Sequence, residues 1–328
     1  MLSFIARRVA MGLFTIWMIS VLSFVIIQLP PGDVVTARQA RLIEQGNESA
    51  ICQADELREE LGLNDPLYVQ YFTWVNGVVH GDFGMSFDWN RPVRDVIAER
   101  LPLTIVVSVA AIVFTFTLAL PIGIYSAVRR YSIGDHFFTF FGFIGLAVPN
   151  FLLALVLMYV ASRYLGWSAG GLFSSEYETA GWGLGKVADL MRHLPVPAIV
   201  LGMAGTADLI RVMRANLSDE VGKPYVMAAR AKGLPERRLI GKYPVRVALN
   251  PFGSTIGFLL PTIVGGAVIV DYVLGLPTLG PVLLQSLLSQ DMLLAGTIVL
   301  LLGVMTVIGT LISDIVLMWL DPRIRLHD

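Results

Sequence analysis

Six long apolar stretches constrain this chain more than any other feature of its sequence. Each has about 20 or more residues and few charges, which is the length a helix needs to cross the hydrocarbon core of a bilayer. They cover Val9–Leu29, Leu103–Val128, Phe137–Val160, Leu194–Met213, Phe252–Leu276 and Met292–Leu320. Of the 328 residues, 55% are hydrophobic, far more than one soluble core requires. We predict an all-α polytopic membrane protein with about six transmembrane helices.

The first stretch follows Arg7 and Arg8 and could be mistaken for an export signal. A cleaved signal peptide has a shorter apolar segment and a small-x-small exit, whereas this stretch leaves through Gln28-Leu-Pro-Pro-Gly32. The surroundings of the arginine pair do not support twin-arginine export either. We therefore expect the first stretch to be an uncleaved helix. In the third stretch, a kink is expected at Pro149.

Flanking charges orient the predicted spans. With the N-terminus in the cytoplasm, the inner segments hold 15 basic and six acidic residues, and the outer segments hold nine basic and 16 acidic ones. Cytoplasmic loops carry the excess of Lys and Arg in membrane proteins. We therefore predict two cytoplasmic termini, an N-terminal transmembrane helix over 1–30, an extracytoplasmic region over 31–100, and a core of helices two to six over 101–328. The core includes a charged cytoplasmic loop over 215–250.

The outer segments are also expected to contain helices. An acidic helix is predicted over Asp55–Leu61, and a second begins at Asp65-Pro66 with apolar residues at helical spacing. The second helix is expected along the outer surface, where it either packs on the spans or helps to dock a partner. Another outer loop, over 163–193, is rich in glycine and aromatic rings, which suit either interfacial anchoring or ligand stacking.

The sequence offers no catalytic or metal-binding constellation. The single cysteine, Cys52, cannot form an intrachain disulfide, and the four histidines are scattered. The glycine-rich segment before Lys186 has the wrong spacing for a phosphate-binding loop, and valine follows that lysine. We expect no enzymatic activity, no bound cofactor, no metal site and no nucleic-acid partner.

Three acidic residues inside the predicted spans are candidates for a structural or pathway role, because a charge in the membrane is costly and often functional. Asp208 lies three residues before Arg211, so a local ion pair is expected. Asp314 lies toward the inner end of the sixth span and is a candidate to pair with another chain. Asp271 lies toward the outer end of the fifth span.

The charged segment Lys223–Arg238 has the signals of a helix-turn-helix. Pro224 suits the first turn of one helix, and Gly233 can adopt the left-handed conformation that ends it. Pro235 and Glu236 suit the first turn of a second helix. The alanines between them leave little side-chain bulk, so another protein could approach closely. The alternative is a solvated amphipathic loop without a partner.

This segment resembles the cytoplasmic EAA loop of ABC importer permeases, in particular the dipeptide/oligopeptide (peptide/nickel/opine) branch, in which Y-V-x-x-A-R-A-K-G-L-x-E-R-R recurs. Further family stretches appear in family order as Leu29-Pro-Pro-Gly-Asp33, Gly81-Asp-Phe-Gly-Met-Ser86, Pro277-Thr-Leu-Gly280 and Asp321-Pro-Arg-Ile-Arg325. They cover nearly the whole chain. The resemblance implies the type I ABC importer permease fold and the first-permease ("B-type") subunit.

The resemblance also implies partners: a second homologous permease, two cytoplasmic ATPase subunits that use ATP and Mg, an extracytoplasmic solute-binding protein, and membrane lipid. In that family the loop supplies a coupling helix that sits in a groove of an ATPase. The positions carried over are Tyr225, Ala228, Ala229, Arg230, Ala231, Lys232, Gly233, Leu234, Glu236 and Arg237. The glutamate that names the motif falls at Met227, which excludes a glutamate-mediated contact.

The implied function is ATP-driven import of short peptides by alternating access, in the bacterial cytoplasmic (inner) membrane. Nickel chelates, glutathione, opines and sugar-derived solutes are carried by similar permeases and remain open. Two alternatives belong to other classes. An ion-coupled secondary transporter would use Asp208 and Asp314 and would work without ATPase subunits. A membrane enzyme or scaffold would need a catalytic constellation that the sequence lacks.

Overall fold

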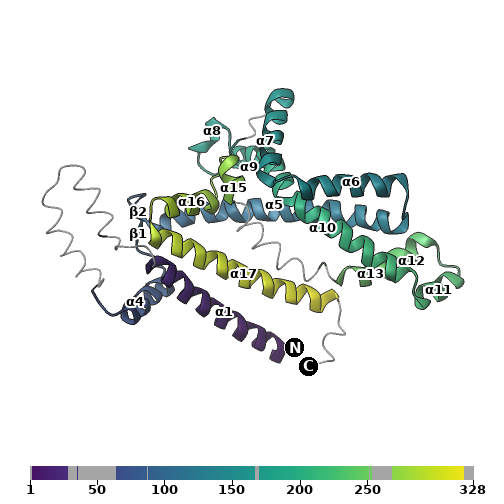
Figure 1. Ribbon diagram of the computed structural model, residues 1–328, viewed down its shortest axis with the longest axis horizontal. Helices are drawn as coiled ribbons and strands as arrows, with labels where there is room; N and C mark the ends of the chain where they lie inside the picture. Colours follow the sequence, from purple (N-terminus) through teal and green to yellow (C-terminus); the bar gives the residue numbers. More distant parts are fainter. Residues whose placement is uncertain are drawn as a thin grey trace.

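The computed structural model describes residues 2–28, 35, 64–86, 88–166, 170–250, 252 and 268–320. These residues are mostly helical (Figure 1). Four described helices are long and apolar enough to cross a membrane: α1 (Leu2–Gln28), α5 (Val93–Val128), α10 (Pro195–Val221) and α17 (Met292–Leu320). They correspond to the first, second, fourth and sixth predicted spans, so the all-α membrane architecture is confirmed.

The third predicted span is broken rather than straight. α6 (Ile133–Ala147) and α7 (Asn150–Val160) are together apolar enough to span, but they bend by 109° where they meet. The break falls at the predicted kink, because Pro149 has no N–H to donate and forces the preceding residue out of the helical region. A π-helical turn, η1 (Ala161–Leu165), extends α7.

The fifth predicted span, Phe252–Leu276, lies largely outside the described residues. Its described end is α15 (Val268–Val273), which a turn at Gly275 follows. The described part of the chain therefore has four spanning helices, or five with the bent pair counted as one. The total of six and the cytoplasmic location of both termini stay predictions.

Two helices extend beyond the predicted spans. α5 begins at Val93 rather than Leu103, with Pro92 as its N-cap residue and Asp95 in its first turn, where a carboxylate favours the helix N-terminus. α10 continues past Met213 to Val221. Hydropathy marks only the part of a helix that suits lipid, and α10 continues until shortly before Pro224, which cannot extend a helix and begins α11 instead.

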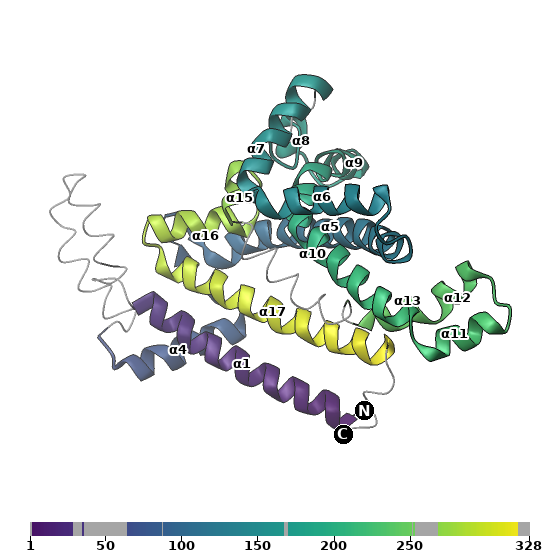
Figure 2. The same ribbon diagram turned by 45° about the vertical axis from the view of Figure 1, so that its right-hand side comes forward.

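The long helices form two packed pairs. α1 (purple) lies along α17 (yellow), and α5 lies along α10, with α6 packed beside α10 (Figures 1 and 2). The approach of α5 to α10 depends on Gly123, because a Cβ there would come within 2.6 Å of the Met213 Cβ. Across the same pair, Thr115 Oγ1 donates to the Gly202 carbonyl at 3.0 Å.

A predicted outer helix packs on the first span. α4 (Leu67–His80) begins directly after Pro66, as the sequence indicates. Tyr71 OH lies 2.8 Å from Ser20 Oγ of α1, and the rings of Phe24, Tyr71 and Trp74 pack together. Of the two expected roles, packing on a span is thus confirmed. The predicted helix at Asp55–Leu61 lies outside the described residues.

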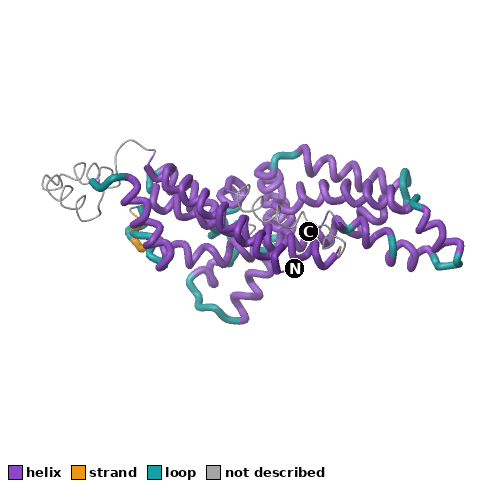
Figure 3. The backbone as a smooth tube through the Cα atoms, turned by 90° about the horizontal axis from the view of Figure 1, so that it is seen from below, coloured by secondary structure: helices purple, strands orange, loops and turns teal. Residues whose placement is uncertain are grey.

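Short elements complete the described structure. β1 (Met85–Ser86) pairs with β2 (Arg91–Pro92) in a small antiparallel hairpin, with Met85 opposite Pro92. The short helices are α8 (Ser175–Glu178), α9 (Leu184–His193), α11 (Pro224–Ala231), α12 (Glu236–Lys242), α13 (Pro244–Ala248) and α16 (Leu279–Leu288). The hairpin (labelled β1 and β2 in Figure 1, orange in Figure 3) and the α11–α12 tip lie at opposite ends of an elongated molecule.

Candidate functional site

The charged segment after α10 folds into a compact helix pair that projects from the molecule (Figure 2). α11 begins at Pro224 and ends at Ala231, two residues before Gly233, and α12 begins at Glu236. Between them Gly233 has φ +78°, the left-handed conformation that the sequence indicates. A Cβ at this position would meet nothing within 4 Å, so backbone geometry rather than crowding favours glycine.

A buried carboxylate joins α11 to α10. Glu220, in the last turn of α10, accepts a hydrogen bond from Tyr225 OH at 2.5 Å and pairs with Lys223 Nζ. Burial, together with the hydrogen bond to Glu220 and its negative charge, raises the pKa of Tyr225 to about 12. The phenol therefore stays protonated and remains a donor at physiological pH. The α11 helix is thus fixed at its first turn to a long helix of the bundle.

An ion pair closes the turn between α11 and α12. Arg230 donates to Glu236 through Nε and, at 3.3 Å, through Nη2. The hydrogen bond from Arg230, opposed by a small effect of burial, lowers the pKa of Glu236. Both side chains are exposed, so solvent screens the pair and it orients the helices more than it stabilises the fold.

The tip presents nearly all of the residues singled out by the sequence. Among them Ala229 and Leu234 are half-buried, and the exposed ones are Tyr225, Ala228, Arg230, Ala231, Lys232, Gly233, Glu236 and Arg237. Met227 is 53% exposed on α11. Sequence reasoning missed the two residues that hold the tip from beneath, Val226 and Leu239, which are fully buried. Each has a second apolar residue beside it, Met227 or Ile240, so the sequence alone did not single out the buried one.

The three acidic candidates lie in separate elements and form no common site. Asp208 pairs with Arg211 at 2.6 Å on the exposed face of α10, as expected. Asp314 of α17 lies 3.3 Å from Arg8 Nη1 of α1. It therefore pairs within this chain, whereas the sequence suggested a pairing with another chain.

The third acid, Asp271, is buried in α15. It accepts a hydrogen bond from Thr278 Oγ1 at 2.5 Å, and its Oδ1 has no hydrogen-bond partner among the described residues. Within these residues no group of three or more His, Cys, Asp or Glu could hold a metal ion.

The lysine of the glycine-rich outer loop is used within the loop. Lys186 is buried, donates to the Ala180 carbonyl at 2.7 Å and lies over the rings of Phe173 and Trp182 at 4.8 and 5.4 Å. A lysine that contacts carbonyls and aromatic faces in this way is not available to a phosphate.

The same loop is closed by a carboxylate. Asp189 accepts from both the N–H and the hydroxyl of Ser174 at 2.7 Å. Burial raises the pKa of Asp189, but these hydrogen bonds and the nearby His193 outweigh it and leave the pKa below its usual value.

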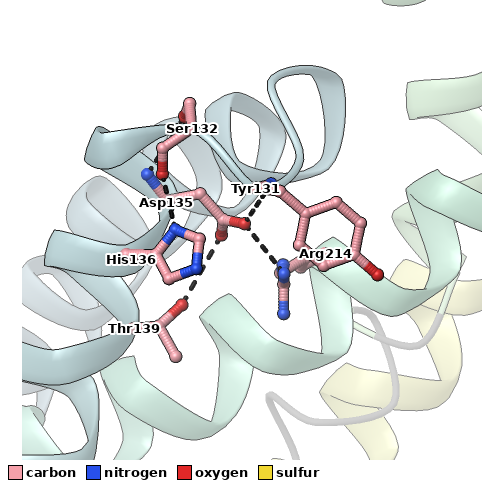
Figure 4. A network of polar contacts seen from close by, with 6 residues as sticks. All are labelled: Tyr131, Ser132, Asp135, His136, Thr139 and Arg214. Atoms are coloured by element: carbon pink, nitrogen blue, oxygen red, sulfur yellow. Dashed lines mark hydrogen bonds and ion pairs between the residues drawn. The ribbon is translucent and has the colours of Figure 1, made fainter.

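A second buried carboxylate at the α11–α12 end went unrecognised in the sequence. Asp135, near the start of α6, accepts from Arg214 Nη2 of α10 at 2.8 Å and from the Tyr131 N–H at 2.9 Å (Figure 4). Ser132 caps α6 by accepting from the Asp135 N–H. The spacing of Ser132 and Asp135 matches a capping box, which could have marked the helix start but not the partner arginine.

A bundle of long apolar helices with an exposed, polar helix pair at one end defines a multi-span membrane protein. The sequence matches the family described as "Binding-protein-dependent transport system inner membrane component" over residues 119–326, and the corresponding N-terminal family over residues 1–110. The chain belongs to this family and is an ABC importer permease subunit.

Relatives match over the whole length. The chain is 36% identical to the oligopeptide transport system permease protein AppB of Bacillus subtilis (strain 168), covering 99% of this chain and 100% of that one. It is 30% identical to the dipeptide transport system permease protein DppB of Escherichia coli (strain K12), covering 99% of each. The MetNI methionine ABC transporter in an inward facing conformation has a similar fold, with a TM-score of 0.52 and 16% identity over 69% of this chain and 96% of that one.

Proposed function

We propose that this chain is one half of the membrane pathway of an importer for short peptides, and that α11 and α12 are its coupling element toward an ATPase subunit. The observation that carries the proposal is the α11–α12 tip, which is exposed, has alanine side chains on α11 and is braced at both of its turns. A partner that pushes on such an element moves it as one body instead of bending it.

The partners follow from the family. A second permease subunit would complete the pathway, two ATPase subunits would bind and hydrolyse ATP with Mg, and a binding protein would deliver the solute. Binding of ATP draws the ATPases together, and the coupling helices transmit that movement to the spans. The nucleotide shifts the equilibrium between inward-open and outward-open states because it binds one of them more tightly. In this proposal, the chain itself contributes no catalytic group.

Short peptides are the proposed solute class because relatives that match over the full length are named as oligopeptide and dipeptide permeases. Ion-coupled transport receives no support from the acidic candidates. Asp208 and Asp314 both face arginines of this chain, so their charges are compensated in place.

Replacing the turn glycine tests the coupling role. In Gly233→Val a β-branched residue must adopt positive φ, at a cost of about 1–2 kcal/mol, which shifts the turn away from its native geometry. We expect assembly to persist while ATP-driven uptake of labelled trialanine in proteoliposomes falls about tenfold.

Gly241→Val is the matched control, because it adds the same side chain within α12 where a Cβ has open space. It should retain uptake. Normal uptake by Gly233→Val would contradict the coupling role. Uptake that persists without ATPase subunits and collapses with a protonophore would contradict the importer itself.

A further inference from the structure

The most buried ion pair at the α11–α12 end is Asp135–Arg214, which joins α6 to α10. The coupling element, α11–α12, does not itself join these two helices. The Asp135 side chain is 1% exposed and that of Arg214 is 30% exposed. Arg214 Nη2 and the Tyr131 N–H converge on the same carboxylate oxygen, Oδ2 (Figure 4). Tyr131 adopts φ +63°, which turns its N–H toward that oxygen. The α5–α6 turn, the start of α6 and α10 thus meet at one carboxylate.

The pair ends a close seam between α6 and α10. A Cβ on Gly142 would lie 3.7 Å from the Ala207 Cβ, and one on Gly145 would lie 2.7 Å from the Met203 Cγ. Asp135 lies seven residues before Gly142, and Arg214 seven residues after Ala207, so the contacts follow an antiparallel register two helical turns apart. Small side chains bring the backbones together, and the ion pair fixes their relative position along the axis.

The same stretch of α10 carries the anchor of the coupling element. Glu220, which binds Lys223 and Tyr225, lies six residues after Arg214, or about 9 Å along a helix. Leu217, between them, is fully buried. A displacement of α11 therefore passes into the part of α10 that Arg214 ties to α6. Beyond α6 the chain turns at Pro149 into α7, which packs on α10 and α15.

We propose that Asp135 and Arg214 are positioning residues for energy coupling: their pair makes α6 move with α10 when the coupling element is pushed. This inference rests on the proposed function. Arg214 contacts the carboxylate through Nη2 alone, so the pair fixes the distance between α6 and α10 at this point. Without the pair, α10 would still carry the load, but the bent α6–α7 unit would follow it loosely.

The test measures labelled trialanine imported per ATP hydrolysed by the complete transporter in proteoliposomes. Asp135→Asn keeps the shape of the side chain and removes its charge. We expect it to lower this ratio at least fivefold, with ATP hydrolysis changed less than twofold. The charge exchange Asp135→Arg with Arg214→Asp should recover at least half of the loss, since only the paired interaction is restored.

The matched control is Arg211→Gln, which removes the exposed arginine partner of Asp208 on the same helix and should keep the wild-type ratio. An unchanged ratio in Asp135→Asn, or an exchange variant that assembles without recovery, would overturn the proposal. If Asp135→Asn does not assemble, Arg214→Gln takes its place, and a wild-type ratio there overturns it equally. Failure of the wild-type transporter to import trialanine would instead count against the proposed function.

Discussion

Carboxylates on the two sides of this molecule are held by different chemistry. At the α11–α12 end they pair with cations: Asp135 with Arg214, Glu220 with Lys223, and Glu236 with Arg230. On the side predicted to be outer, the buried ones accept from hydroxyl groups: Asp189 from Ser174, Asp291 from Ser86 and, toward the outer end of the fifth predicted span, Asp271 from Thr278. The predicted outer loops hold more acidic than basic residues, so their buried carboxylates accept mainly from neutral donors, although His193 lies 3.7 Å from Asp189 and the exposed Glu99 pairs with Arg91.

The difference bears on movement. A hydroxyl or amide donor acts over a short range and in one geometry, so the outer contacts fix the hairpin and its neighbours in place. Exposed charge pairs tolerate changes of geometry and weaken with salt. The exposed Arg230–Glu236 pair at the tip can therefore adjust when a partner docks, whereas the largely buried Asp135–Arg214 pair is screened less and keeps α6 fixed to α10.

Removing an outer carboxylate should give the largest loss of stability. Asp291 is buried and accepts from the Ser86 hydroxyl at 2.5 Å, from the Asp88 N–H at 3.2 Å and from the Leu294 N–H at 3.3 Å. Asp291→Ala leaves several donors in a buried site, each costing about 1–3 kcal/mol. We expect a clear fall in the thermal unfolding temperature of the purified transporter, independent of salt.

The control for that experiment is Asp82→Ala, on the segment leading into the same hairpin. Asp82 is exposed and accepts one hydrogen bond, from the Gly84 N–H at 3.0 Å. Its loss should cost much less. Equal unfolding temperatures for the two variants would show that the Asp291 contacts do not hold the hairpin.

An intermediate effect is expected at the joint between α10 and α11. Tyr225→Phe removes the hydroxyl that donates to Glu220, and a hydrogen bond to a charged group contributes about 1.5–3 kcal/mol. Because the pKa of Tyr225 is raised to about 12, its contribution is full below the unfolded value near 10 and is lost only above it. Uptake by the variant should fall a few-fold, equally at pH 6 and pH 9. A loss that disappears at either pH would contradict this assignment.

The smallest effect is expected at the exposed turn. Glu236→Gln removes the partner of Arg230, and an exposed pair contributes little to folding. We expect an unchanged unfolding temperature, with binding-protein-stimulated ATP hydrolysis made less dependent on salt. The exchange of Arg230→Glu with Glu236→Arg should restore the salt dependence. A large drop in the unfolding temperature of Glu236→Gln would contradict the expected difference between the ion pairs of the α11–α12 end and the buried outer contacts.

Local signals predicted much of this structure. Pro224 and Gly233 indicated where α11 begins and ends, and Asp65-Pro66 indicated the start of α4, because capping and backbone preferences act over a few residues. Apolar length located the spans but not their ends, which is why Val93 and Val221 were missed. The size of the bend at Pro149 depends on what α6 and α7 pack against, and proline alone does not determine it.

Pairings across the fold were the hardest to predict. Asp208 and Arg211 share one helix face, so spacing alone predicted their contact. Asp135 and Arg214 are 79 residues apart, and Asp314 and Arg8 are further still. The charge of a carboxylate does not indicate which of the many arginines it will contact. The packing of the helices determines that pairing.

The exposed methionine of the tip has a consequence for compatibility between subunits. On the proposed docking surface Met227 would enter the ATPase groove as an apolar, adaptable side chain. An ATPase whose groove holds a cation suited to a glutamate would bury that charge without a partner, which costs several kcal/mol after relaxation. Permeases with methionine at this position should therefore bind such ATPases poorly. In a cell with several transporters, the cost of burying the unpaired cation would disfavour assembly of a permease with another transporter's ATPase.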